Sequence, residues 1–229
     1  MRKILLSSAI VMAMGSASVV AHAAESATLS LTGSITPGAC DVSLSSASVD
    51  FGKIPASTLT DTMNQIRATP VTVSVDCDAP TAVAVQTVDN RASSAMTMAE
   101  IESSMGVTFA TLTDANVLGL GNDSAGSKVG AMMLAISDAT LNGAADSNLL
   151  VSSDKSAWTM KTISSTASYP LAKDGYFALG QTASSTTPAA VTKASYTLQN
   201  NLFLKRADKY PSGEQVNIDG NVTFSVVYL

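Results

Sequence analysis

The sequence predicts an all-β protein, built as an antiparallel sandwich or barrel, and three observations favour this class. Short runs of β-favouring residues recur along the 229-residue chain. Turn-forming residues separate these runs, and with one short exception the intervals hold no helical pattern of about 10–15 residues. Finally, both ends of the expected mature chain alternate strictly between apolar and small or polar residues, which is typical of half-buried strands.

The β-favouring runs are rich in Val, Thr and Ser, and they end at Gly, Pro, Asn or Asp. They are residues 27–35, 47–54, 71–77, 82–88, 128–136, 175–180, 195–205 and 216–228. One stretch, 96–105, has a different period. Met98, Ile101 and Met105 recur there at helical spacing after Thr97, which predicts a short helix or turn packed on the edge of the sandwich.

The first 23 residues are typical of a secretory signal. Arg2 and Lys3 form a basic start, residues 4–14 are apolar, and residues 21–23 have the small-x-small pattern of a cleavage site. The apolar run is too short to cross a bilayer as a helix, and no later run is long enough. We therefore expect an exported protein without a transmembrane segment.

Charge and histidine content argue against two classes of function. Without residues 1–23 the formal net charge of −5 becomes −7, because Arg2 and Lys3 are lost, and an acidic chain is a poor partner for nucleic acid. The single histidine, His22, lies in the signal. The mature chain thus has no imidazole for a catalytic triad or a zinc site. We predict a protein that is not an enzyme, with no catalytic residues, no metal and no cofactor.

The two cysteines, Cys40 and Cys77, allow only one pairing. Because disulfides persist in exported proteins, we predict that these residues form a disulfide rather than a pair of reactive thiols. In the chain-entropy model, a loop of this length stabilises the fold by roughly 4 kcal/mol.

Four further motifs have a functional and a plainer structural interpretation, and we prefer the structural one for each. Residues 152–155 match S-x-x-K, which we attribute to chance in a serine-rich chain. Residues 122–126 carry oxygen ligands, but without a bidentate glutamate at EF-hand spacing they indicate a polar turn rather than a calcium site. Residues 89–91 favour a loop held by an Arg–carboxylate pair over a partner contact. Trp158 favours a core or loop anchor over a sugar-stacking surface.

The two alternating ends raise a question about pairing, because neither contains Lys, Arg or Pro to block an exposed sheet edge. Either both strands are buried within the fold, or they pair with another chain. The apolar face of the first end consists of Ala27, Leu29, Leu31, Gly33 and Ile35. The apolar face of the last end includes Val222, Phe224, Val226 and Tyr228.

The order LSLTGSI, a first cysteine, VDFGKI, a second cysteine closing a strand, and a penultimate tyrosine in VTFSVVYL resembles bacterial pilin subunits of the chaperone–usher type. More closely, the whole mature chain resembles a family of secreted, fimbria-associated proteins that carries a domain-of-unknown-function label. The stretches TPGAC, DNRASS, LGLGNDSAGSKVGAMML, LLVSSDKSAWT and VYL carry the closer resemblance.

The resemblance implies an immunoglobulin-like, incomplete, pilin-type antiparallel β-sandwich. In that family a missing strand leaves a hydrophobic groove beside the C-terminal strand. A periplasmic pilus chaperone fills the groove first, and at the outer-membrane usher the N-terminal extension of a neighbouring fimbrial subunit replaces it. On this chain, the donor-strand residues would be Ala27, Leu29, Leu31, Gly33 and Ile35. The chaperone and groove strand would carry Val222, Phe224, Val226 and Tyr228.

The resemblance also implies a domain plan and a localisation. A signal peptide (1–23) precedes an N-terminal extension that serves as donor strand (24–36) and a pilin-like sandwich (37–229) with an insertion at about 90–175. The expected function is a structural fimbrial subunit, assembled by donor-strand exchange in the periplasm and displayed at the cell surface for cell adhesion. The alternative is a self-complemented monomer, periplasmic or secreted, that fills its own groove and in one version binds a ligand.

Overall fold

The computed structural model describes residues 28–35 and 38–229, and these two parts are described separately. The predicted signal peptide and Ala27 lie outside the described residues. The strands are β1 (Cys40–Leu44), β2 (Met63–Asp89), β3 (Gly130–Leu141), β4 (Ala144–Asp146), β5 (Asn148–Ser152), β6 (Thr159–Thr162), β7 (Tyr169–Pro170), β8 (Tyr176–Leu179), β9 (Ala190–Lys205) and β10 (Val222–Tyr228). The helices are α1 (Met98–Met105) and the 3₁₀ turns η1 (Ala56–Thr58), η2 (Ala92–Ser94), η3 (Asp114–Asn116) and η4 (Ala207–Lys209).

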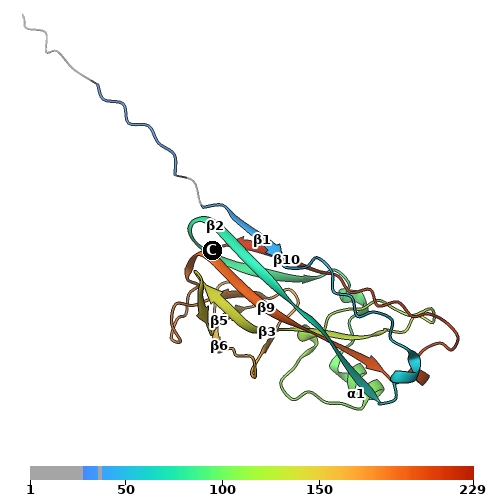
Figure 1. Ribbon diagram of the computed structural model, residues 1–229. Coiled ribbons are helices and arrows are strands. Elements are labelled where there is room, and N and C mark those ends of the chain that lie inside the picture. The colour runs from blue at the N-terminus through green and yellow to red at the C-terminus, as the bar shows by residue number, and fades with distance from the viewer. Residues whose placement is uncertain (1–27, 36–37) are drawn as a thin grey trace, which may run out of the picture. The chain divides into compact units, whose positions relative to one another are not determined.

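The ten strands form one curled sheet in which every strand pairing among the described residues is antiparallel. The all-β prediction is therefore confirmed. The first half of β2 lies beside β9 and β1, and β9 in turn pairs with β3. The second half of β2 pairs with β10 and β8. As Figure 1 shows, β2 runs through the whole sandwich and belongs to both of its faces.

The core lies between the two faces and consists mainly of branched aliphatic side chains. Val73 and Val75 from the first half of β2 meet Val85 from the second half, together with Leu198 of β9. Phe177 is the aromatic centre, with its ring edge-on to Tyr196 at a centroid distance of 4.8 Å. Each of these side chains is almost completely buried, so apolar burial is the main stabilising contribution of the sandwich.

The predicted helix over 96–105 is confirmed as α1. Thr97 caps its first turn: the hydroxyl accepts a hydrogen bond from the Glu100 amide while the Glu100 carboxylate accepts one from the Thr97 amide. The helix ends at Gly106, whose φ of 68° suits a left-handed cap. Ile101 and Met105 are fully buried in a second apolar cluster that also contains Phe203 of β9.

Three predicted strands differ from the structure. Residues 28–35 form no strand, and the run 47–54 forms none either, because Gly52 turns the chain with a φ of 68°. In the closing run only β10 is a strand. Residues 216–221 leave the ladder because their partner β2 ends at Asp89, and the Asp219 amide donates instead to the Leu120 carbonyl.

In two other regions the structure has longer strands than the sequence predicted. The runs 71–77 and 82–88 belong to the single strand β2, in which a bulge after Asp76 replaces the expected turn. Within the predicted insertion, residues 130–141 form β3, which pairs along its whole length with β9, and α1 packs on the adjacent cluster. The short strands β4 to β7 lie in serine- and threonine-rich sequence that gave no strand signal.

Candidate functional site: an open strand edge beside an apolar groove

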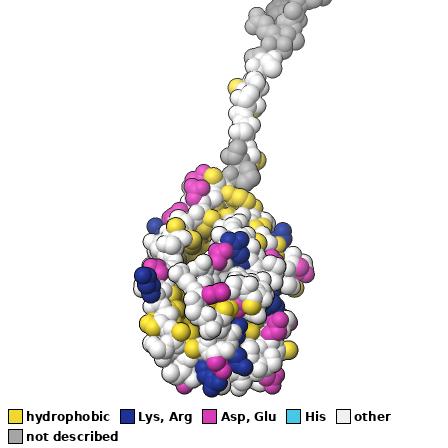
Figure 2. Space-filling view, turned by 90° about the vertical axis from the view of Figure 1, so that its right-hand side faces the viewer, with side chains coloured by type: hydrophobic (Ala, Val, Ile, Leu, Met, Phe, Trp, Pro, Cys, Tyr) yellow, Lys and Arg dark blue, Asp and Glu magenta, His cyan; other side chains and the backbone are white. Residues whose placement is uncertain are grey.

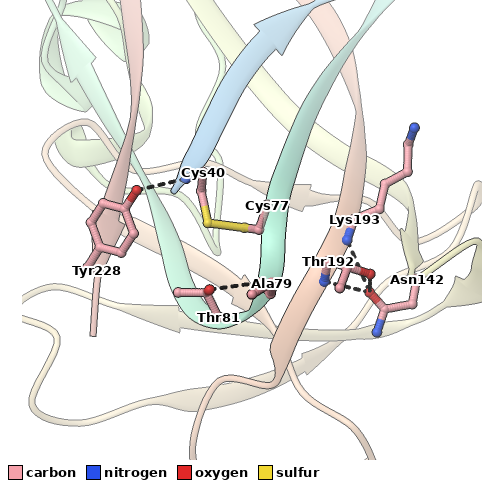
Figure 3. Close-up of a disulfide and its surroundings, with 8 residues drawn as sticks. All are labelled: Cys40, Cys77, Ala79, Thr81, Asn142, Thr192, Lys193 and Tyr228. Atoms are coloured by element: carbon pink, nitrogen blue, oxygen red, sulfur yellow. Dashed lines mark hydrogen bonds between the residues drawn. A yellow bond between two sulfur atoms is a disulfide. The ribbon is translucent and has the colours of Figure 1, made fainter. Parts of the chain in front are cut away.

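The predicted disulfide is present and joins β1 to β2. Cys40 and Cys77 are directly opposite in the ladder, with Cα atoms 4.0 Å apart. The next pair, Ala39 and Asp78, exchanges a backbone hydrogen bond, so the cysteines occupy a pair without one. Figure 3 shows that the Tyr228 hydroxyl accepts a 2.8 Å hydrogen bond from the Cys40 amide. The last strand is therefore tied to the start of the first.

The pairing of β10 leaves one of its edges open. Among the described residues, β10 pairs with β2 alone. The Asn221 carbonyl accepts from the Asn90 amide, and the Leu229 amide donates to the Ala82 carbonyl. Since bonded and non-bonded pairs alternate in an antiparallel ladder, the odd-numbered residues of β10 bond to β2. The even-numbered residues direct their N–H and C=O groups to the open edge: Val222, Phe224, Val226 and Tyr228.

The hydrogen bonds of β2 agree with this assignment. Thr87 lies opposite Phe224, yet its amide donates to the Gly175 carbonyl and its carbonyl accepts from the Asp174 amide, both on the side away from β10. The open edge of β10 thus offers a row of backbone donors and acceptors that an added strand could use.

Three of these even-numbered side chains face the core, but they are only half-buried. Val222, Phe224 and Val226 pack against the main apolar cluster, and the Phe224 ring lies edge-on to Phe177 at 6.4 Å. Tyr228 is 49% exposed. The sandwich is therefore covered incompletely along the side where β10 has no neighbour.

A groove of about 1050 Å³ lies beside the first part of this edge. One wall is residues 49–54, and the other is residues 215–218 and 220–222 together with Phe224; both walls carry polar as well as apolar side chains. Its floor comes from the middle of the sandwich: Val71 of β2, Met132 and Leu134 of β3, and Leu198, Asn200 and Leu204 of β9. Figure 2 shows that hydrophobic side chains reach the surface of the sandwich as a band between polar ones.

The structure places the predicted groove residues in two locations. Val222 and Phe224 line the groove, and Val226 packs on the core beyond it. Tyr228 lines a separate pocket of about 420 Å³, together with Trp158 and Lys155. The sequence predicted no groove role for the wall at 49–54 or for the floor residue Asn200. Their signals were the apolar run VDFGKI and an asparagine on the inward face of an otherwise apolar alternation.

Hydrogen bonds rigidify the far end of the groove around Tyr210. Its hydroxyl donates to the Val129 carbonyl at 2.8 Å and accepts from the Lys205 amide at 3.0 Å, and burial raises the pKa of Tyr210 to about 12. The Lys205 ammonium is buried over the Tyr210 ring and donates to the Lys128 carbonyl. Burial lowers the pKa of Lys205 because the charged form loses water.

The N-terminal segment, residues 28–35, presents its apolar residues to solvent. The exposed fractions of Leu29, Leu31 and Ile35 are 81%, 86% and 104%. A Cβ added at Gly33 would meet no atom within 4 Å. The segment thus carries large aliphatic side chains at alternate positions without any strand of its own.

The loop that contains residues 89–91 is held by polar contacts, in line with the structural interpretation. The Arg91 guanidinium forms an ion pair with Asp219 at 2.7 Å. The buried Asp89 carboxylate accepts from the amides of Arg91 and Gly119, each at 2.9 Å. These contacts fix the start of β10 relative to the end of β2.

Two of the remaining motifs are turns whose side chains bond locally. The Asp123 carboxylate accepts from the amides of Ala125 and Ser127, which makes a polar turn. The Ser152 hydroxyl accepts from the Lys155 amide at 2.9 Å within a loop. Within residues 28–35 and 38–229, no group of three His, Cys, Asp or Glu side chains could hold a metal ion. No helix in these ranges combines the length and hydropathy needed to span a bilayer.

Comparison with known proteins gives three matches. The family model described as protein of unknown function (DUF1120) matches residues 29–133. Protein GltF of Escherichia coli (strain K12) is 31% identical over 252 residues, covering 100% of this chain and 99% of GltF. Uncharacterized protein YhcF of the same strain is 26% identical over 229 residues, covering 91% of this chain and 93% of YhcF. With this family match and its similarity to GltF along the whole length, the chain belongs to the DUF1120 protein family.

Proposed function

We propose that this protein is a structural fimbrial subunit assembled by donor-strand exchange through a chaperone–usher pathway, in a fibre that serves cell adhesion. The observation that carries the proposal is the open edge of β10 beside an apolar groove. The occupant we assign to the groove is the N-terminal segment of a second copy of the chain. Its alternating apolar side chains are exposed in this structure.

Length and spacing support this occupant. Residues 28–35 would span about 26 Å as a strand, and the seven residues of β10 span about 23 Å. Alternate side chains of a strand recur about every 6–7 Å on one face, so Leu29, Leu31 and Ile35 can enter the groove together. Burying these three side chains would contribute roughly 5–9 kcal/mol before the cost of ordering the segment.

Backbone pairing supplies the second contribution. The even-numbered residues of β10 direct donors and acceptors toward the groove side, and an added strand would satisfy them in a site that excludes water. This is recognition by β-strand addition, in which backbone bonds give affinity and side-chain pockets give specificity.

The open edge of β10 is also the reason to expect assembly partners. An unpaired edge next to an apolar groove is an aggregation hazard, so a subunit needs temporary cover between export and incorporation. A periplasmic pilus chaperone would provide it, and an outer-membrane usher would exchange it for the neighbouring subunit. The proposed route runs from the periplasm to a fimbrium on the cell surface.

The test compares two double variants of the exported chain, residues 24–229, produced together with a pilus chaperone. Leu29→Asp with Leu31→Asp charges the apolar face, and Thr28→Asp with Ser30→Asp adds the same charge to the polar face as a matched control. We expect both variants to bind the chaperone and only the control to form polymers, measured as heat-sensitive ladders on denaturing gels.

Two results would contradict the proposal. If the unaltered chain refolds alone to a stable monomer at every concentration tested, as judged by light scattering, the sandwich needs no second copy. If the apolar-face variant then unfolds at a lower urea concentration than the control, the segment completes its own fold, and the protein is the self-complemented monomer.

A further inference from the structure

The floor of the groove contains one polar side chain among otherwise apolar ones. Asn200 lies on β9, between Leu198 and Leu204 on the floor, and is only 2% exposed. Buried polar groups normally have hydrogen-bond partners, because an unpaired one loses its water without compensation. The contacts of this amide therefore indicate what the groove accepts.

The nitrogen of the Asn200 side-chain amide has a structural role. Its Nδ2 donates to the Thr69 carbonyl at 2.8 Å. Thr69 lies in the irregularity between Ala68 and Val71, where the β2–β9 ladder shifts register and this carbonyl has no ladder partner. The hydrogen bond fixes the orientation of the amide, since only the nitrogen can donate to a carbonyl.

The oxygen of the same amide has no such role. Asn200 Oδ1 accepts no hydrogen bond from any other described residue. Among the described residues, only Thr87 Oγ1 is a fully buried polar side-chain atom without a partner, so Asn200 Oδ1 keeps contact with solvent. A carbonyl-type acceptor thus belongs to the lining of a groove whose neighbouring side chains are Leu134, Leu198 and Leu204. An aliphatic side chain docked against Oδ1 would exclude water and leave the acceptor unpaired.

We propose that Asn200 determines the specificity of the groove by fixing the register of the docked segment, with Gly33 of a second copy opposite Asn200 Oδ1. The inference rests on the proposed function. On the apolar face of residues 28–35, Leu29, Leu31 and Ile35 carry aliphatic side chains, and only Gly33 has none. Glycine leaves room for one water molecule to hydrogen-bond to Oδ1, whereas the other three would displace it.

The test measures binding of a fluorescent peptide with the sequence of residues 24–36 to the exported chain by anisotropy. Two peptide variants, Gly33→Leu and Leu31→Gly, are measured against the unaltered chain and against Asn200→Ala. We expect Gly33→Leu to weaken binding more than 10-fold on the unaltered chain and less than 3-fold on Asn200→Ala. Leu31→Gly should weaken binding to the two chains equally, because position 31 faces an apolar pocket.

The possible results separate the two proposals. If the unaltered peptide does not bind, both fail. If it binds, but Gly33→Leu weakens binding to the same extent on both chains, the role of Asn200 is overturned while strand addition stands. Should Asn200→Ala fail to fold, Asn200→Ser replaces it, because the hydroxyl keeps a donor on the Thr69 side.

A series of peptides measured on the unaltered chain tests whether Gly33 lies opposite Asn200, without any variant of the chain. Affinity should fall in the order Gly, Ala, Leu at position 33 and in the opposite order at position 31. The same order at both positions would overturn the assignment of Gly33 to Asn200.

Discussion

The open edge of β10 predicts that two adjacent valines respond oppositely to proline. Val226 directs its amide to the open edge, whereas the Val227 amide bonds to Ala84 of β2. Both side chains are half-buried, so the pair is matched in residue type and degree of burial. Val227→Pro removes a ladder hydrogen bond and leaves the carbonyl of Ala84, itself 1% exposed, without a partner. Val226→Pro removes no bond within the chain.

The magnitudes follow from these contacts. An unpaired buried carbonyl costs about 1–3 kcal/mol, so Val227→Pro should destabilise by roughly that amount. Val226→Pro keeps a side chain of similar size and should cost less than about 1 kcal/mol. With a urea m-value of about 2 kcal/mol/M, a difference of about 2 kcal/mol between the variants separates their unfolding midpoints by about 1 M.

Urea unfolding followed by circular dichroism measures this difference directly. The same two variants are then tested for binding of the peptide of residues 24–36. Val226→Pro should stay folded and lose peptide binding, because the added strand needs the amide at the open edge. If Val226→Pro is as destabilised as Val227→Pro, the even-numbered residues are already paired, and the inferred edge is wrong.

Two further predictions concern stability. Replacing Cys40 and Cys77 with alanine should destabilise the fold by about 4 kcal/mol in the chain-entropy model for a sequence separation of 37 residues, measured as a lower urea midpoint that reductant no longer shifts; an unchanged midpoint would contradict it. Hydrogen bonds from Lys128 and from the Thr97 amide lower the pKa of Glu100 below its usual value of 4.5. The stability this carboxylate contributes is therefore present above about pH 4.5 and is lost as the pH falls through the lowered pKa. Because Glu100 is 46% exposed, the effect should stay within about 1 kcal/mol, and Glu100→Gln should flatten the acid side of the stability profile.

Local patterns in the sequence were enough to predict the strands that carry strong alternation, the capped helix and the disulfide. In α1, the helical spacing of Ile101 and Met105 and the cap at Thr97 agree, so local and tertiary preferences coincide. Cys40 and Cys77 had only one possible pairing. These features depend on residues near one another in sequence or on a count that excludes alternatives.

The parts that could not be predicted depend on where a partner strand ends. Residues 216–221 alternate as well as β10 does, but β2 has no residue left to pair with them beyond Asn90, so Asp219 bonds to Leu120 instead. The run 47–54 has a strand-like composition, and the positive φ of Gly52 removes it from the ladder. It becomes a wall of the groove, a role that only the folded arrangement assigns.

Asn200 shows the same limit at the level of a single residue. Its inward position was visible as a break in the apolar alternation of β9. What the amide bonds to depends on the register shift near Thr69, more than a hundred residues earlier in the chain. Sequence spacing can locate such a residue, but it cannot tell whether the nitrogen or the oxygen of its amide is left without a hydrogen bond.

The strand β2 also has a mechanical consequence for a linear fibre of the proposed kind. Tension would enter a subunit through the residues just before Cys40 and leave through the strand added beside β10. The disulfide transfers that load covalently from β1 to β2, and β2 continues, through the bulge after Asp76, to the seven-residue ladder it shares with β10. Pulling would therefore shear that ladder instead of peeling off the five-residue β1 one bond at a time.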